Sequence, residues 1–201
     1  MTKIFHVRHG MNDFIGKRIA GRKPGVHLNA EGQAQAQRLV ARLTHEKIDR
    51  AFSSPLERCQ ETAAPFALKA GLKVELLPNV AEIDYGDWTG QTIEEVKRHP
   101  AWEKWNSFRT GSRVPNGETM LEIQSRMVGE VQRLHATFPG QTLALFSHGD
   151  PIKTVILFAL GIPLDFFQRL EISPASISLI CLGDDFVQVG YVNDQAASRD
   201  L

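Results

Sequence analysis

Short apolar segments rich in β-branched and aromatic residues recur along the chain, and this pattern predicts strands. The predicted strands lie around Lys3–Val7, Val74–Leu77, Thr142–Ser147, Ile177–Leu182 and Phe186–Val192. A further short strand is predicted to end at Ser53, because Ser54 and Pro55 have the residue types that begin a helix.

Between the early strands the apolar positions recur every three or four residues, which is the spacing of one face of an α-helix. One such face follows Asn29, a predicted N-cap, over residues 36–43. A second covers residues 56–70, in a helix predicted to begin with Ser54 as N-cap and Pro55 as its first residue. Pro65 is expected to kink or restart this second helix.

Two later helices have clear start signals. Thr119 and Glu122 have the spacing of a capping box, and apolar residues repeat from Met120 to Leu134. Asp150 is predicted to be the N-cap of a helix that ends near Gly161. Strands alternating with helices favour a three-layer α/β domain with a mainly parallel sheet, whose ligands gather at the carboxyl ends of the strands.

Length and composition are consistent with this architecture. The chain has 201 residues and is 42% hydrophobic, so we expect one domain over residues 1–201 with one substantial core. Lys plus Arg and Asp plus Glu both number 23, which excludes a general attraction to nucleic acid or to an anionic membrane. Any attraction to phosphate must therefore be local.

The location and the thiols are predicted from simple patterns. The first ten residues are too polar for a signal peptide, and the longest apolar run, Val155–Ile162, is too short to cross a bilayer. We therefore expect a soluble cytoplasmic protein. Cys59 and Cys181 form no CxxC pair and are interpreted as buried, unpaired thiols.

Candidate chemistry follows two of the predicted strands. The tripeptide Arg8-His9-Gly10 follows the first strand, and Ser147-His148-Gly149 follows a later one, so both histidines are expected at one edge of the sheet. Arg58 lies in the first turn of the predicted helix after Ser54, near its free backbone N–H groups. Each element alone is commonly only structural, but together they indicate an anion pocket.

Four blocks of sequence then show a family resemblance. Arg8–Gly10, the segment 53–58, the segment Glu82–Gly90 and Ser147–Gly149 resemble, in order, the signatures of the histidine phosphatase superfamily, in its phosphoglycerate mutase-like branch. The resemblance implies a three-layer α/β/α sandwich with a mixed, mostly parallel sheet. It also implies that the chain is an enzyme.

The resemblance assigns roles to particular residues. His9 would be the nucleophile, with Arg8, Arg58 and His148 binding the phosphoryl oxygens beside Asn12 and Gly149. These roles suit the chemistry, because a neutral imidazole is a competent nucleophile and guanidinium groups bind phosphate oxygens in bidentate fashion. No metal and no cofactor is required.

Glu82 matches the family's general acid, which protonates the leaving oxygen and then accepts a proton from the attacking water. The alternative for Glu82 is a purely structural role, as a carboxylate paired with one of the arginines. Asp84 and Asp150 are rival acids, and Asp150 ranks second because an N-cap role already explains it.

The rim of the pocket departs from the family pattern. Many relatives continue the first block with Glu-Thr and have a later asparagine, whereas this chain has Met11, Asn12 and, at the later position, Ile15. Asn12 is expected to supply the hydrogen bonds of the threonine, and Ile15 indicates a more apolar mouth. The basic segment 16–23 is interpreted as a mobile loop near the distal end of a substrate.

Four aromatic residues lie between the second and third predicted helices. Trp88, Trp102, Trp105 and Phe108 have spacings typical of core packing, and a lid over the pocket is the alternative.

The sequence thus predicts a metal-independent phosphomonoester hydrolase that forms a phosphohistidine, acts on a small phosphorylated metabolite and releases inorganic phosphate. One alternative is a phosphoglycerate mutase, although this chain is short for the segments that close the site in such enzymes. A non-catalytic phospho-ligand-binding module is another, disfavoured because His9 and its partners are all present. A two-histidine metal site has no supporting motif. The sequence carries no indication of the oligomeric state.

Overall fold

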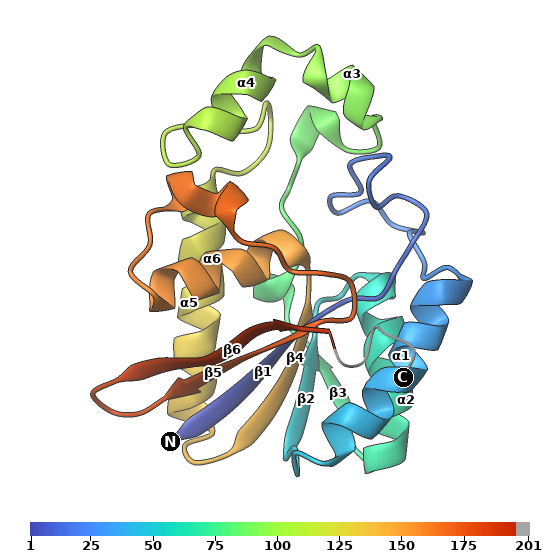
Figure 1. The fold of residues 1–201 in the computed structure, drawn as a ribbon, viewed down its shortest axis with the longest axis vertical. Helices are drawn as coiled ribbons and strands as arrows, with labels where there is room; N and C mark the ends of the chain where they lie inside the picture. The colour runs from blue at the N-terminus through green and yellow to red at the C-terminus, as the bar shows by residue number, and fades with distance from the viewer. Residues whose placement is uncertain (196–201) are drawn as a thin grey trace.

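Six strands form one mixed sheet in the computed structural model, which describes residues 1–195 (Figure 1). The strands are β1 (Thr2–Arg8), β2 (Arg50–Ser53), β3 (Val74–Leu76), β4 (Thr142–Ser147), β5 (Ile177–Leu182) and β6 (Val187–Asp194). Their order is β3-β2-β4-β1-β5-β6. The first four in this order pair in parallel, and β5 pairs antiparallel with both β1 and β6. The mostly parallel sheet implied by the resemblance is confirmed.

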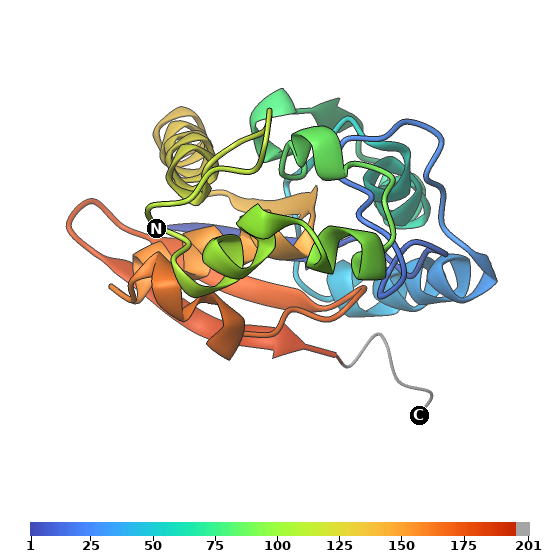
Figure 2. The same ribbon diagram turned by 90° about the horizontal axis from the view of Figure 1, so that it is seen from above.

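Helices cover both faces of this sheet. They are α1 (Ala30–Thr44), α2 (Glu57–Ala70), α3 (Ile93–Lys97), α4 (Pro100–Ser107), α5 (Met120–Thr137) and α6 (Gly149–Ala159). Short 3₁₀ helices cover Pro78–Val80, Gly86–Trp88 and Leu164–Arg169. Figures 1 and 2 show α3 and α4 above the upper end of the sheet, where β1 and β4 end.

The alternation of side chains along β1 explains the two layers of helices. Ile4 packs into a core cluster with residues of α5 and α6, whereas Phe5 and Val7 pack into a second cluster with residues of α1 and α2. Neighbouring side chains of a strand point to opposite faces of a sheet, so each face buries its own pair of helices. The three-layer architecture is confirmed.

Two of the predicted helix starts are confirmed at the level of the cap. The Asn29 side chain accepts a hydrogen bond from the Gly32 N–H, and Thr119 and Glu122 form both bonds of a capping box. Pro65 neither ends nor restarts α2, which continues to Ala70 with its buried face against the sheet.

Two other helix starts are corrected. Helix α2 begins at Glu57 with Leu56 as N-cap, because the Ser54 hydroxyl instead accepts from the Leu56 N–H and holds the turn before the helix. Helix α6 has His148 as N-cap, which places Asp150 inside the first turn. The N-cap role predicted for Asp150 is therefore wrong.

Other predictions concern the chain as a whole. Cys59 and Cys181 are buried free thiols, as predicted. Within residues 1–195, no helix combines the length and the apolar character needed to span a bilayer. The single domain expected over residues 1–201 stays a prediction, since its last six residues lie outside the described residues.

Candidate active site

The parallel pairing of β1 and β4 brings the two strand-end histidines together. Arg8 is opposite Ser147 in the register of the two strands, so His9 and His148 both follow the same edge of the sheet. Their ring centroids lie 5.2 Å apart with an interplanar angle of 64°. The convergence expected from the two tripeptides is present in the structure.

His9 is held as a neutral imidazole. Its Nδ1 lies 2.7 Å from the Gly10 carbonyl oxygen and donates a hydrogen bond to it, which leaves Nε2 without a proton. Burial, and then the nearby Arg58 and Arg8 guanidinium groups, hold the pKa of His9 well below 6.5. The free Nε2 lone pair is therefore available for nucleophilic attack at neutral pH.

Arg58 and Arg8 present donors that the protein itself does not satisfy. Arg58 is fully buried, and its Nη2 donates to the Gly21 carbonyl oxygen at 2.9 Å. Arg8 donates from Nη1 to the carbonyl oxygen of Ile172. Within residues 1–195, Arg58 Nε and Nη1 and Arg8 Nε have no partner. Buried cationic donors without partners are costly, so this arrangement favours a bound anion.

His148 is fixed on one side and faces Glu82 on the other. Its Nε2 lies 2.8 Å from the Ser54 hydroxyl and 3.4 Å from Cys59 Sγ. A hydroxyl that donates to Nε2 leaves the proton on Nδ1, which lies 3.7 Å from Glu82 Oε2. Burial, and then Arg58, lower the pKa of His148 well below 6.5. His148 thus offers a neutral N–H donor to the site.

The two neighbours of His148 differ in reactivity. Burial raises the pKa of the Cys59 thiol to about 12, so Cys59 is not a nucleophile at neutral pH. Glu82 is 15% exposed, and its Oε1 accepts from the Ile83 N–H at 3.0 Å. Burial, and then the Asp150 carboxylate, raise the pKa of Glu82 to about 7. A carboxyl group with that pKa can donate and accept a proton near neutrality.

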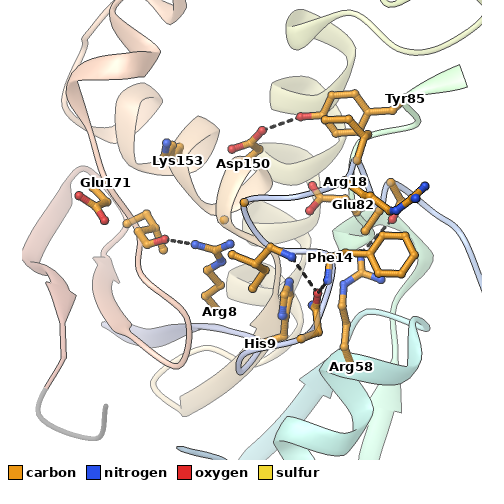
Figure 3. A pocket seen from close by; sticks show the side chains of 18 residues that line it. Arg8, His9, Phe14, Arg18, Arg58, Glu82, Tyr85, Asp150, Lys153 and Glu171 are labelled. Atoms are coloured by element: carbon orange, nitrogen blue, oxygen red, sulfur yellow. Dashed lines mark hydrogen bonds between the residues drawn. The ribbon is translucent and has the colours of Figure 1, made fainter. Parts of the chain in front are cut away.

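These groups line a cavity of about 320 Å³ at the end of the sheet (Figure 3). Asn12 is buried in its wall, where its Oδ1 accepts hydrogen bonds from the N–H groups of Phe14 and Ile15. Asn12 therefore holds the loop in place, and Ile15 contributes the apolar surface that its position predicted.

The structure separates the rival acids. Asp150 lines the cavity and accepts a hydrogen bond from the Tyr85 hydroxyl at 2.8 Å. Asp84 Oδ1 accepts from the Gly86 N–H, so Asp84 stabilises a turn, and it is not among the described residues that line the cavity. Gly149 lies beside Arg8, since a Cβ atom at this glycine would lie 3.1 Å from Arg8 Nε.

Part of the basic loop lines the cavity, whereas the tryptophans do not. Residues 18–21 line the cavity, whereas Arg22 pairs with Glu118. Trp88 is fully buried and makes edge-to-face contacts with Trp102 and Trp105. The tryptophans are not among the described residues that line the cavity, so core packing describes them better than a lid. Phe108 is 49% exposed, so the prediction of core packing is wrong for this residue.

Three polar residues of the cavity were not predicted as site residues by the sequence analysis: Lys153, Glu171 and Tyr85. Lys153 follows Asp150 by three positions, which places both side chains on one face of α6. That spacing was available in the sequence. Glu171 lies outside any helix or strand, in the segment before β5, where no sequence pattern indicates a site.

One cluster has residue types that also bind metals. Ligand atoms of His9, Glu82 and His148 all lie within 4.8 Å of one another. The Arg58 and Arg8 guanidinium groups lie close enough to His9 to lower its pKa, and two cations beside the cluster oppose the binding of a further cation.

Known proteins resemble this chain over most of its length. The family model of the histidine phosphatase superfamily (branch 1) matches residues 4–195. Phosphoserine phosphatase 1 of Hydrogenobacter thermophilus is 29% identical over 185 residues, which are 90% of this chain and 86% of that protein. A probable phosphoglycerate mutase GpmB of Yersinia enterocolitica is 29% identical over 90% of this chain and 85% of that protein.

Solved structures show the same fold. A mutant of phosphoserine phosphatase from Entamoeba histolytica, crystallised with phosphoserine, superposes with a TM-score of 0.88 at 25% identity and covers 98% of this chain and 99% of its own. Bacillus stearothermophilus YhfR superposes with a TM-score of 0.93 at 23% identity and covers 99% of this chain and 100% of its own.

Proposed function

Because this chain belongs to the histidine phosphatase superfamily, branch 1, we propose that it hydrolyses a small phosphomonoester through a phosphohistidine at His9. The observation that carries the proposal is that the unprotonated His9 Nε2 shares one cavity with buried arginine donors that lack partners in the described part of the chain. A phosphoryl group placed between them would satisfy those donors and present its phosphorus atom to His9 Nε2.

In the first step the Nε2 lone pair of His9 forms a bond to phosphorus, and the bond from phosphorus to the leaving oxygen breaks. Glu82 gives its proton to that oxygen, which leaves as the alcohol. Arg8, Arg58 and the Nδ1–H of His148 bind the phosphoryl oxygens and stabilise the charge that spreads over them. None of these steps requires a metal ion.

In the second step water attacks the phosphorus of phosphohistidine and the N–P bond breaks. Ionised Glu82 accepts the proton of that water, so the enzyme returns to its starting state and releases inorganic phosphate. A pKa of about 7 suits this exchange, since the carboxyl group must act as an acid in one step and as a base in the next.

The names of the relatives indicate a metabolite-sized substrate. They include two phosphoserine phosphatases and a probable phosphoglycerate mutase, and further structures with the same fold are an α-ribazole-5′-phosphate phosphatase and a glucosyl-3-phosphoglycerate phosphatase. A cavity of about 320 Å³ suits molecules of that size. The cytoplasmic location expected from the sequence stays a prediction.

The proposal is tested by hydrolysis of p-nitrophenyl phosphate and a panel of metabolite phosphates with EDTA present. The wild type should release phosphate without a bisphosphate primer, and His9→Ala should lose activity by about 10⁴-fold or more. Ordinary activity in His9→Ala would overturn the assignment. Transfer to a second substrate position only after priming would instead support the mutase alternative, and binding without turnover would support a non-catalytic module.

A further inference from the structure

Beyond the phosphate-binding groups, the wall of the cavity carries charges of both signs. Lys153 comes from α6, and Glu171 comes from the segment that precedes β5. In Figure 3 both lie on the side of the cavity opposite Phe14 and Arg58, with Asp150 between them and Tyr85. Among the described residues 1–195, the side chains of Lys153 and Glu171 form no hydrogen bond or salt bridge, although the Lys153 ammonium contacts an aromatic ring.

Lys153 is positioned by an aromatic ring rather than by a carboxylate. Its half-buried ammonium group lies 4.7 Å from the ring centroid of Phe167, and the Arg109 guanidinium lies 4.9 Å from the same centroid. The cation–π contact orients the ammonium but leaves its hydrogen-bond donors available. Burial lowers the pKa of Lys153, and this cost would be offset by a negatively charged group of a ligand.

The backbone beside Glu171 is held by Arg8, one of the proposed phosphate-binding residues. The carbonyl oxygen of the next residue, Ile172, accepts the hydrogen bond from Arg8 Nη1. The residue that would hold the phosphoryl group therefore also fixes the backbone beside Glu171. The Glu171 side chain is exposed, and it lines the same cavity as Arg8 and Lys153.

We propose that the substrate is a zwitterionic phosphomonoester, whose carboxylate binds Lys153 and whose ammonium group binds Glu171. The inference rests on the proposed phosphatase function and narrows its substrate class. A neutral sugar phosphate would make no charged contact with either Lys153 or Glu171. A substrate with only a second anionic group would satisfy Lys153 but would meet the carboxylates of Glu171 and Asp150.

Four phosphomonoesters separate the two charge contacts. O-Phosphoserine carries both groups, 2-phosphoglycolate only the carboxylate, phosphoethanolamine only the ammonium group, and glycerol 3-phosphate neither. We expect kcat/KM to be highest for phosphoserine. It should exceed the value for phosphoethanolamine by about tenfold, because that compound lacks the contact to half-buried Lys153. It should exceed the value for phosphoglycolate by about threefold, because that compound lacks the contact to exposed Glu171. Equal values for phosphoserine and glycerol 3-phosphate would overturn the inference.

Two variants then assign the contacts. Lys153→Met should reduce kcat/KM about tenfold for phosphoserine and phosphoglycolate but much less for phosphoethanolamine, and Glu171→Gln should reduce it for phosphoserine and phosphoethanolamine but not for phosphoglycolate. Lys69→Met and Glu94→Gln make the same chemical changes at exposed positions outside the cavity wall and control for net charge. Equal losses on all four substrates would contradict the assignment.

The two proposals fail in different ways. If p-nitrophenyl phosphate is hydrolysed in a reaction that needs His9 while the four metabolites show no charge preference, only the substrate class is wrong. If no phosphomonoester is hydrolysed, including p-nitrophenyl phosphate, the phosphatase function is overturned and the substrate class with it.

Discussion

At the scale of single residues, the site works through groups kept in unusual protonation states. His9 and His148 are buried and stay neutral, whereas Glu82 takes up a proton near neutral pH. Burial is the largest cause in all three. It disfavours the charged form, which is the cation of a histidine and the anion of a glutamate, and so shifts the two kinds of pKa in opposite directions.

The raised pKa of Glu82 predicts a pH profile. Protonated Glu82 is needed to release an alkoxide, so kcat/KM for glycerol 3-phosphate or another alkyl ester should fall as the pH rises through about 7. Initial rates from pH 5 to 9 give this profile. p-Nitrophenol is a better leaving group and should show a shallower fall, and Glu82→Gln should lose the high-pH limb on alkyl esters. An unchanged limb in Glu82→Gln would assign the acid to another group, with Asp150 the next to test.

We expect Arg58 to bind the anion at a cost in the stability of the anion-free protein. Two nitrogen atoms of the fully buried Arg58 guanidinium have no hydrogen-bond partner among residues 1–195. Arg58→Met should therefore leave the melting temperature in phosphate-free buffer unchanged or raise it, because a buried charge is replaced by an apolar side chain. The same variant should lose the increase in melting temperature that vanadate or phosphate gives the wild type. Equal anion-induced increases in both proteins, measured by scanning calorimetry, would show that Arg58 does not bind the anion.

At the scale of elements, close backbone contact positions the loop that carries His9. A Cβ atom at Gly32 in α1 would lie 2.0 Å from the Met11 carbonyl oxygen, and one at Gly10 would lie 2.7 Å from the Gly32 carbonyl oxygen. The first turn of α1 can approach the loop this closely only because both residues are glycines.

This contact predicts opposite effects for two similar substitutions. Gly32→Ala should lower the free energy of unfolding by about 2 kcal/mol or more, since backbone atoms cannot move aside without displacing the helix. Gly129→Ala, at an exposed position within α5 where the added Cβ meets no described residue within 4 Å, should raise it by up to about 1 kcal/mol. Urea denaturation measures both. An unchanged free energy of unfolding in Gly32→Ala would mean that α1 is not held against the loop.

His6, in strand β1, makes the stability of the protein depend on pH. His6 is fully buried, neither ring nitrogen has a partner within residues 1–195, and burial lowers its pKa from 6.5 to about 4. As the pH falls below 6.5 the unfolded chain therefore binds a proton at this position that the folded protein does not, and stability is lost down to about pH 4.

Replacing His6 should remove this part of the pH dependence. Between pH 6.5 and 5 the wild type should lose between about 1 and 2 kcal/mol more stability than His6→Leu, because the unfolded chain goes from half to almost full protonation at this position while the folded protein stays largely unprotonated. His9 and His148 contribute with the same sign in both proteins, so the difference isolates His6. Parallel stability curves for the two proteins would contradict a neutral buried His6.

At the scale of the whole molecule, local signals predicted most of the fold. The signals for strands β4 and β5 and for the capping box at Thr119 each lie within a few consecutive residues. The structure has all three at the predicted positions. The start of α6 was misplaced because Asp150 has the residue type of an N-cap, whereas its carboxylate accepts from Tyr85, which lies far away in the sequence. Long-range contacts of this kind leave no local pattern.

The difference between local patterns and long-range contacts also explains which residues of the candidate site were predictable. His9, His148 and Arg58 were predictable because each lies at a strand end or a helix start that the sequence itself indicates. Glu171 reaches the cavity only because β5 runs antiparallel beside β1 and brings the preceding segment back toward Arg8. The charges that would select a substrate thus depend on topology, whereas the residues assigned to the chemistry depend on short motifs.

The most direct test of the account is to trap the phosphorylated enzyme. ³²P-labelled substrate mixed with the protein and quenched in alkali within milliseconds should leave label that is stable to base and labile to acid, as phosphohistidine is, and mass spectrometry should place it on the peptide that contains His9. His9→Ala should carry no label. Label on another residue, or turnover with no labelled intermediate on that timescale and no dependence on His9, would contradict the account.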